Sequence, residues 1–306
     1  MTEAVKTIKR KSKIRASGKD KAFLFFVYLF LTLSLLIVLL PLIYVVSASF
    51  SDSKAVVSGE VWLLPGRPPL KGDTPAFEKP QIMSGFLNSF IYMFSGTAVS
   101  LVLTVLAAYP LSRGELAGKK LFNGLFLFTM LFSGGMIPSY ILLRDLNMLN
   151  TRWAIIIPTA LSVWNLIITR TYYQNTIPGD IYEAAYLDGC SDLRILFSIV
   201  IPLSGPILAV MGLYYAIGQW NSYFNAMIYL KDQELFPLQI ILRNILIQNQ
   251  MSGQMVTDVK QLERMQGMAQ LLKYSVMVVS CLPLMVLYPF VQKFFVKGVM
   301  FGAVKG

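Results

Sequence analysis

Long uncharged apolar stretches dominate this chain of 306 residues, and the longest unbroken runs cover 22–51, 80–112 and 195–230. A helix needs about 20 apolar residues to cross a bilayer. Backbone groups in hydrocarbon have no water to bond, so segments of this length must satisfy them internally as helices. Charged residues make up only 14% of the chain, against about 25% in soluble domains. We therefore predict an all-α integral membrane protein with about six transmembrane helices.

The apolar runs divide into six predicted spans, with the 195–230 run split by Pro202 and Pro206 because proline interrupts helices. The segment 235–248 is also apolar, but it is short and carries Arg243 in its middle. A charge at the bilayer centre costs at least about 2.5 kcal/mol, so we predict an interfacial or extracytoplasmic helix there. The predicted spans are 22–47, 86–111, 121–143, 153–169, 203–228 and 274–292.

The distribution of positive charge predicts the orientation of the spans. Six spans place both termini on one side, and the connections on that side carry 16 of the 27 Lys and Arg residues, eight of them within residues 1–21. Cytoplasmic connections are enriched in Lys and Arg, so we predict that both termini are cytoplasmic. The predicted parts are a basic cytoplasmic arm (1–21), a transmembrane domain (22–292) with a cytoplasmic loop (174–202), and a cytoplasmic tail (293–306). The arm has no aromatic residue, which favours a solvated segment beside the membrane over a nucleic-acid site.

The loop 174–202 holds the most specific local pattern of the chain. Asp180 and Glu183 have the spacing of a capping box at a helix start, and Gly189 can adopt the left-handed conformation that ends a helix. Ser191 or Asp192 can then cap a second helix. The loop therefore predicts a short helix, a glycine elbow and a second helix that ends near residue 202.

The first of these helices combines small side chains for close approach, apolar side chains for a groove, and acidic side chains for Arg or Lys. Such a helix can dock in a groove of another protein and carry force to it. Its candidate contact residues are Tyr182, Glu183, Ala184, Ala185, Tyr186, Leu187, Asp188 and Gly189.

The same loop resembles the signature of permease subunits of binding-protein-dependent ABC importers. That signature is Glu-Ala-Ala, three residues, Gly, nine residues, Ile, one residue and Leu-Pro; here 183–185, Gly189 and 199–202 keep the spacing, with Ile201 in place of Leu. The stretches 88–89, 108–113, 220–224 and 302–306 resemble the carbohydrate branch, the maltose-type and lipooligosaccharide-type permeases. The resemblance covers roughly residues 20–306 and implies a type I importer permease fold in a prokaryotic cell membrane.

The resemblance also implies partners, and with them the source of energy. In that family the loop helix is a coupling helix that docks on an ATPase subunit. We accordingly expect a second similar permease, two ATPase subunits with their ATP and Mg, an extracytoplasmic solute-binding protein, and surrounding lipid. The chain itself should hold no cofactor or metal, because it has no histidine and its segment 114–120 departs from a phosphate-binding loop. We expect no catalytic residue and no enzymatic activity in this chain.

Polar and aromatic residues inside the predicted spans are the candidates for a substrate path, because sugars offer hydroxyls to amides and apolar ring faces to aromatic side chains. The alternative is that the amides bond neighbouring helices and that the rings sit at the membrane interface. The loop 231–273 is likewise either a docking surface for the binding protein or a solvated connector. The path candidates are Asn88, Tyr92, Trp164, Asn165, Gln219, Trp220, Asn221, Tyr223 and Asn225.

A self-sufficient secondary carrier or channel for a small polar solute is the alternative function. Carriers coupled to protons or sodium often hold an ionisable residue within the membrane, and the six predicted spans contain no Asp, Glu, Lys or Arg. This composition favours energy input through the cytoplasmic loop.

Overall fold

The computed structural model describes residues 17–52, 55–56, 58–66, 80–252, 273–275, 277–278, 280–290 and 292, and its regular structure there is helical. Most of the basic arm (1–16), the tail 293–306 and the stretch 253–272 of the expected docking loop lie outside the described residues. The predicted all-α class is confirmed for the part that the structure describes.

The helices differ widely in length, and three one-turn segments (η1, η2 and η3) lie between them. They are α1 (Gly18–Ser49), α4 (Pro80–Ser112), α5 (Lys119–Leu131), α6 (Met136–Asp145), α7 (Trp153–Ile156), η1 (Ile157–Thr159), α8 (Val163–Thr176), α9 (Gly179–Leu187), α10 (Asp192–Ile195), η2 (Leu196–Val200), α11 (Ile201–Leu203), α12 (Gly205–Trp220), α13 (Phe224–Tyr229), η3 (Gln233–Leu235) and α14 (Leu238–Ser252). A last helix covers Lys273–Phe290.

Three helices are continuous and apolar enough to cross a membrane: α1, α4 and Lys273–Phe290. The count reaches six if each of three bent helix pairs forms one span. The predicted spans over 121–143 and 153–169 are therefore not single continuous helices, whereas the bend at Ser204 falls where the division near Pro202 and Pro206 was predicted. Bends of 112°, 51° and 83° separate α5 from α6, α7–η1 from α8, and α10–α11 from α12.

The bends have local causes. Gly135, before α6, has φ 85°, in the left-handed region. Ser204, between α11 and α12, turns its hydroxyl back onto the Val200 carbonyl, a bond that often bends helices. Pro206 then stands in the first turn of α12, where proline starts a helix without losing a bond. A further break at residues 221–223 separates α12 from α13, so the predicted fifth span ends early.

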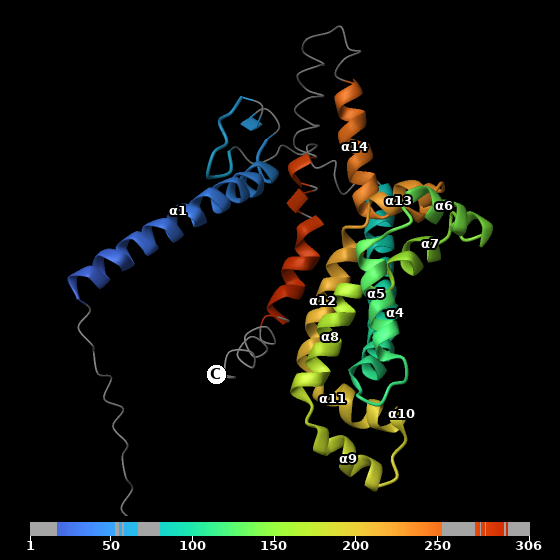
Figure 1. Cartoon of the computed structure of the whole chain (residues 1–306). Coiled ribbons are helices and arrows are strands. Elements are labelled where there is room, and N and C mark those ends of the chain that lie inside the picture. Colours follow the sequence, from blue (N-terminus) through green and yellow to red (C-terminus); the bar gives the residue numbers. More distant parts are fainter. Residues whose placement is uncertain are drawn as a thin grey trace, which may run out of the picture.

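The central helix of the bundle is α4, which lies beside α5, α8 and α12 (Figure 1). One face of α4 carries small buried residues at intervals of about four, and such a face lets helix backbones approach closely. Thr104 on this face is bonded to the hydroxyl of Tyr215 on α12, with 2.6 Å between the oxygens. The small residues are Gly85, Ser89, Gly96, Ser100, Thr104 and Ala108.

The two ends of the bundle differ. The segment α9–α11 closes the lower end in Figure 1, and α6, α7, α13 and α14 gather at the upper end. The helix predicted over 235–248 is α14, which packs Leu238 and Ile241 against the first turns of α4 and leaves Arg243 exposed. The predicted helix is thus confirmed, and the exposed arginine explains how the segment accommodates a charge.

Helix α1 stands apart from this bundle (Figure 1), and its most apolar stretch is not buried within the chain. Within the part of the chain that the structure describes, its contacts with other segments lie in its last turns. Ser47 donates a hydrogen bond to the Leu63 carbonyl at 2.9 Å, and the ring of Tyr44 lies edge-on to Tyr274, 5.6 Å between centroids. An apolar helix exposed all round needs lipid or another protein to cover it.

Candidate functional site

The predicted helix of the loop 174–202 is α9, but its start differs from the prediction. The N-cap is Pro178 (φ −61°, ψ 144°) and no side chain caps the helix, so Gly179 is the first helical residue. The predicted capping box of Asp180 and Glu183 is therefore wrong, because the helix starts before Asp180 can stand at its cap. The Asp180 carboxylate lies in the first turn, where the helix dipole favours negative charge.

The end of α9 is the predicted glycine elbow. Gly189 has φ 74°, and two backbone bonds close the turn: Cys190 N–H to the Ala185 carbonyl at 2.9 Å and Gly189 N–H to the Tyr186 carbonyl at 3.0 Å. This pair of bonds defines a Schellman motif with glycine in the left-handed position. Ser191 is the N-cap of α10 through its backbone, without a side-chain cap. The elbow and the second helix are confirmed.

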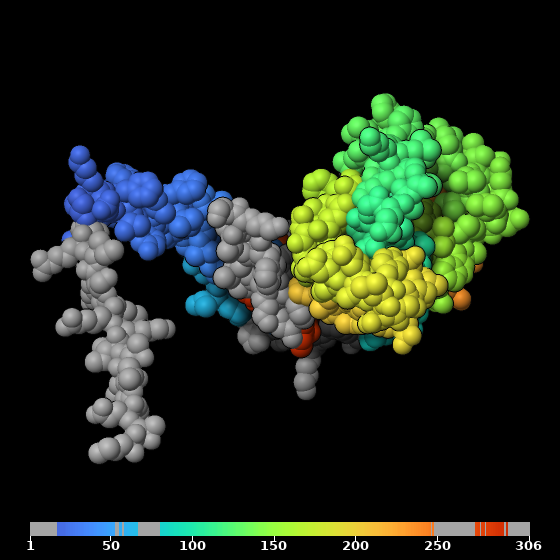
Figure 2. All heavy atoms as spheres, turned by 60° about the horizontal axis from the view of Figure 1, so that its bottom comes forward, coloured from blue at the N-terminus to red at the C-terminus, as the bar shows by residue number. Residues whose placement is uncertain are grey.

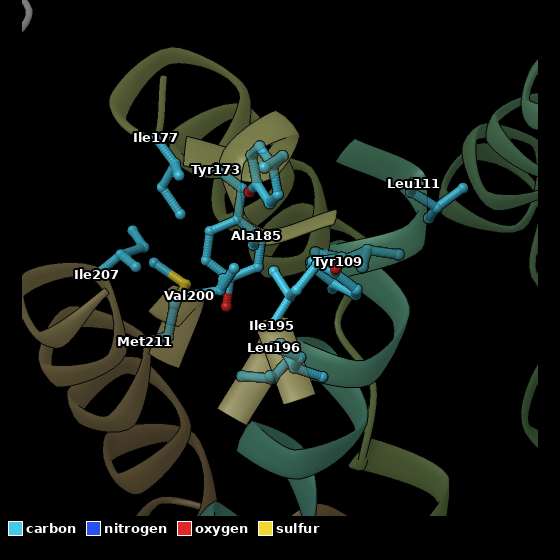
Figure 3. Close-up of a cluster of buried hydrophobic side chains, with 14 of the residues drawn as sticks. Tyr109, Leu111, Tyr173, Ile177, Ala185, Ile195, Leu196, Val200, Ile207 and Met211 are labelled. Atoms are coloured by element: carbon cyan, nitrogen blue, oxygen red, sulfur yellow. The ribbon is translucent and has the colours of Figure 1, made fainter. Parts of the chain in front are cut away.

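The eight candidate contact residues divide between two faces of α9. Tyr182 and Ala185 are buried in the chain's own core together with Ile195 and Val200, and Figure 3 shows Ala185 inside this cluster. Glu183, Ala184, Leu187 and Asp188 are exposed, and so is the edge of Tyr186. Figure 2 shows α9 and α10 as one continuous yellow surface at this end of the molecule.

The exposed face of α9 can therefore dock on another protein while the buried face packs against the bundle. Leu187 is 90% exposed, so a large apolar side chain is available to a partner on this face. Around it, Asp180, Glu183 and Asp188 supply negative charge. Six of the eight predicted contact residues, Glu183, Ala184, Tyr186, Leu187, Asp188 and Gly189, are thus exposed, whereas Tyr182 and Ala185 are buried.

Two tyrosines of α9 interact with charged residues outside this helix. Burial raises the pKa of the Tyr182 hydroxyl, and the neighbouring Arg113 guanidinium opposes this shift. The hydrogen bond to Asp192 raises the pKa of the Tyr186 hydroxyl, which therefore stays protonated at neutral pH and donates to that carboxylate at 2.6 Å. The sequence analysis named Arg113 only within the stretch 108–113 that resembles the carbohydrate branch, and it gave this residue no role of its own.

A second candidate site is a cavity of about 530 Å³ between α12 and the break that separates η1 from α8. It brings together three of the predicted path residues, Trp164, Asn165 and Gln219. Six further lining residues were not predicted, although three of them lie on α12 within five residues of Gln219 and Ser222 follows shortly after that helix. The additional lining residues are Thr159, Ser162, Tyr214, Tyr215, Gly218 and Ser222.

The cavity is lined by neutral hydroxyl, amide and aromatic groups, several of which are held by hydrogen bonds. Gln219 Nε2 donates to Thr159 Oγ1 at 2.9 Å, and the Ser162 N–H donates to the Tyr215 hydroxyl at 3.3 Å. These bonds join α12 to the break before α8. Trp164 and Tyr214 are exposed, so aromatic faces are available at the rim.

Asn88, Tyr92 and Trp220 do not line the cavity. Asn88 Nδ2 donates to the carbonyls of Glu234 and Phe236, and the Tyr92 hydroxyl donates to the Leu235 carbonyl at 2.8 Å. Trp220 Nε1 donates to the Ser280 carbonyl at 2.9 Å. The bonds of Asn88 match the alternative stated for the amides, whereas Tyr92 and Trp220 are buried within the bundle and join neighbouring segments.

The last three path candidates lie beyond the cavity as well. Asn221, Tyr223 and Asn225 occupy the break after α12 and the start of α13. The Asn221 side-chain amide donates back to the Ile217 carbonyl at 3.0 Å.

Among the described residues, no group of three His, Cys, Asp or Glu side chains could hold a metal ion.

A bundle of apolar helices with a cavity between bent helices, and with an exposed short helix and a glycine elbow at one end, is consistent with the class of membrane permease subunits. The chain belongs to the permease proteins of ABC transporters. It is 41% identical to the polygalacturonan/rhamnogalacturonan transport system permease protein YtcP of Bacillus subtilis (strain 168), covering 94% of this chain and 100% of that protein. Protein LplC of the same organism is 36% identical, covering 88% of this chain and 90% of that protein.

A solved structure shares the fold as well. It is the crystal structure of a bacterial ABC transporter involved in the import of the acidic polysaccharide alginate, and one of its chains superposes with a TM-score of 0.81 at 32% identity. The match covers 92% of this chain and 99% of that chain. No protein-family model matches this chain.

Proposed function

We propose that this chain is a translocation subunit of an ATP-driven importer of oligosaccharides. The observation that carries the proposal is the cavity lined by neutral amides, hydroxyls and aromatic rings, groups that match the hydroxyls and apolar ring faces of sugars. Relatives named as permeases for polygalacturonan and rhamnogalacturonan, and for melibiose, raffinose and stachyose, support this substrate class. Family membership also weighs against the alternative of a self-sufficient carrier.

The geometry connects the cavity to the docking face through two helices. Asn165, in the first turn of α8, lines the cavity, and α8 ends at Thr176, just before α9. Helix α12 starts beyond the bend at Ser204 and reaches the cavity at Gln219. A displacement of α9 would therefore move the near ends of both helices and reshape the cavity at their far ends, which is alternating access driven from one surface.

Partner subunits complete this mechanism. ATP and Mg would be bound by two ATPase subunits, one of which receives the exposed face of α9; Glu183 would pair with its Arg or Lys, and Ala184 would allow close approach. A second, similar permease would cover the open rim of the cavity, and a solute-binding protein would dock at the end formed by α6, α13 and α14. The assembly would sit in the cell membrane of a prokaryote, with α9 and both termini in the cytoplasm.

The docking role of α9 predicts a loss of partner binding. Glu183→Arg reverses a charge on the exposed face of a helix whose buried face stays intact, so the ATPase should no longer co-purify with the chain. Reversing a charge beside a complementary partner costs several kcal/mol, about a hundredfold or more in affinity. Affinity purification from the native membrane followed by identification of the bound proteins measures this.

The control for this experiment is Glu60→Arg, the same charge change at an exposed residue in the loop after α1. This variant should retain the ATPase. If wild type brings down no ATPase in several mild detergents, the importer proposal is wrong; if Glu183→Arg retains it fully, α9 is not the docking helix.

The cavity predicts a defect in transport itself. Trp164→Ala removes an aromatic face from the rim, and the maximal rate of ATP-dependent oligosaccharide uptake into vesicles should fall by about tenfold, equivalent to roughly 1.4 kcal/mol. The matched control is Trp153→Ala, since Trp153 is 54% exposed against 60% for Trp164 but does not line the cavity. Equal effects of the two substitutions would remove the cavity from the transport path.

A further inference from the structure

An arginine directly after α4 contacts two aromatic side chains of α9. Arg113 directly follows α4, and its guanidinium carbon lies 3.9 Å from the centroid of the Tyr182 ring and 5.4 Å from that of Tyr186. Its Nη2 also donates to the Tyr186 hydroxyl at 3.1 Å. That hydroxyl donates in turn to Asp192 Oδ1 at 2.6 Å. A single guanidinium thus connects α4 with α9 and, through one hydroxyl, with α10.

The charge of Arg113 is largely enclosed by these contacts. Its side chain is only 15% exposed, and the nearest ion-pair partner, Glu115, lies 3.8 Å away with its own side chain 80% exposed. Exposed ion pairs contribute little, whereas a cation over an aromatic face gains more as it is desolvated. The planar guanidinium can stack on a ring and donate from its edge at the same time, which a lysine ammonium cannot do.

The backbone that carries Arg113 is itself anchored. Lys119 Nζ donates to the Arg113 carbonyl at 2.7 Å and to the Ser112 carbonyl at 3.4 Å. Gln174 Nε2, on α8, donates to the same Ser112 carbonyl at 3.2 Å. Side chains from α5 and α8 thus bond the carbonyls at the end of α4. These bonds fix the position of the backbone that carries the Arg113 guanidinium.

We propose that Arg113 is a positioning residue that couples the movement of α9 to α4. Along the chain, α9 continues only into α8 on one side and into α10 through the Gly189 elbow on the other. Arg113 adds a direct connection to α4, the helix that packs along α8 and α12 and that touches Gln219 of the cavity through Gly96. Force on α9 would then move α4 together with α8. The inference rests on the proposed importer function.

The test compares uptake with ATP hydrolysis in the same vesicles. The complete complex, purified with its partner permease and ATPases, is reconstituted with its binding protein, and the ATP consumed per oligosaccharide imported is measured. Arg113→Ala should still assemble and hydrolyse ATP, but the ATP consumed per sugar should rise by about tenfold. Arg113→Lys, which keeps the charge without the planar fork, should lie between this variant and wild type.

Three further variants separate coupling from general damage. Replacing the contact partners, Tyr182→Leu with Tyr186→Phe, should raise the same ratio, and adding Arg113→Ala should raise it little more, because residues in one network are not additive. Arg144→Ala removes an exposed arginine whose ion pair is with Asp145 and should leave the ratio unchanged.

The possible outcomes distinguish this inference from the proposed function. A wild-type ratio in Arg113→Ala, or an equal loss of hydrolysis and uptake, would overturn the coupling role. If Arg113→Ala does not assemble, Arg113→Lys decides by the same criterion: a raised ratio supports the role and a wild-type ratio rejects it. A wild-type complex that imports no sugar with ATP would instead overturn the proposed function.

Discussion

Gly189→Pro should abolish transport while leaving the chain inserted in the membrane. Gly189 has φ 74°, whereas proline fixes φ near −65°, so the elbow cannot form. Proline also removes the N–H that bonds to the Tyr186 carbonyl at 3.0 Å, and it disfavours the observed conformation of Asp188, at φ −76° and ψ 3°. ATP-dependent uptake into vesicles, normalised to the amount of inserted chain, measures the loss.

A graded series at the same position tests the physical cause. Within the described chain, no atom beyond the two sequence neighbours lies within 4 Å of a Cβ added at Gly189, so strain inside this chain can arise only from the backbone conformation. Left-handed backbone costs most L-residues roughly 1–2 kcal/mol, but asparagine tolerates it. Gly189→Ala should therefore reduce uptake by about 5- to 30-fold, and Gly189→Asn should stay close to wild type. Gly179→Ala, equally uncrowded but with ordinary φ, is the control; a defect there equal to that of Gly189→Ala would contradict the explanation.

The elbow could be predicted from sequence because its determinants are local. A glycine at the end of a helical pattern needs no distant partner to adopt the left-handed conformation. The helix after it was predicted from the cap candidates Ser191 and Asp192, which are also local. The faces of α9 were harder to assign. Burial of Tyr182 and Ala185 depends on residues from α8 and the segment after α9, and also on residues of α4, which lie far away in sequence and become neighbours only in the bundle.

The hydrophobicity of the sequence does not predict the bends in the apolar segments. Uncharged runs satisfy the length criterion for a span whether or not the helix is continuous, so 121–143 was predicted as one helix. The sequence did contain a signal for the break, since Gly134 and Gly135 interrupt the run. The size of the bend, 112°, depends on how α6 packs over α7 and α13, and no local pattern encodes it.

Most of the predicted path residues do not line the cavity, and the reason is again the packing of helices that are distant in sequence. Six of the nine predicted residues lie outside the cavity, although all are polar or aromatic residues within apolar segments. Which side of α12 faces the cavity is set by its contact with α4, where the small residues Gly96, Ser100 and Thr104 allow close packing. A candidate on the far side, such as Trp220, is buried against Phe86 and Phe90 instead. Selecting the cavity residues required knowledge of this helix pair.

The contact between α4 and α12 leads to the second large expected effect. Gly96→Ala should reduce uptake by about tenfold or more, equivalent to at least roughly 1.4 kcal/mol, because an added Cβ would lie 2.6 Å from Gln219 Cδ and 2.8 Å from its Nε2. The Gln219 side chain must move, and it then loses its bond to Thr159 at the cavity wall. Uptake rate and thermal stability of the purified complex should be measured together.

Two comparisons show whether crowding of Gln219 is the cause. Gly212→Ala, on α12, places its Cβ 3.6 Å from Leu101 Cδ1, an ordinary contact, so alanine's higher helix propensity should leave stability equal or slightly raised. Adding Gln219→Ala to Gly96→Ala removes the crowded atoms and should restore thermal stability, whereas uptake should stay low because the cavity has lost its amide. If the double variant is no more stable than Gly96→Ala alone, overpacking at this point is not what limits the protein. Full uptake in the double variant would show instead that Gln219 serves the packing of α12 and not the passage of the sugar.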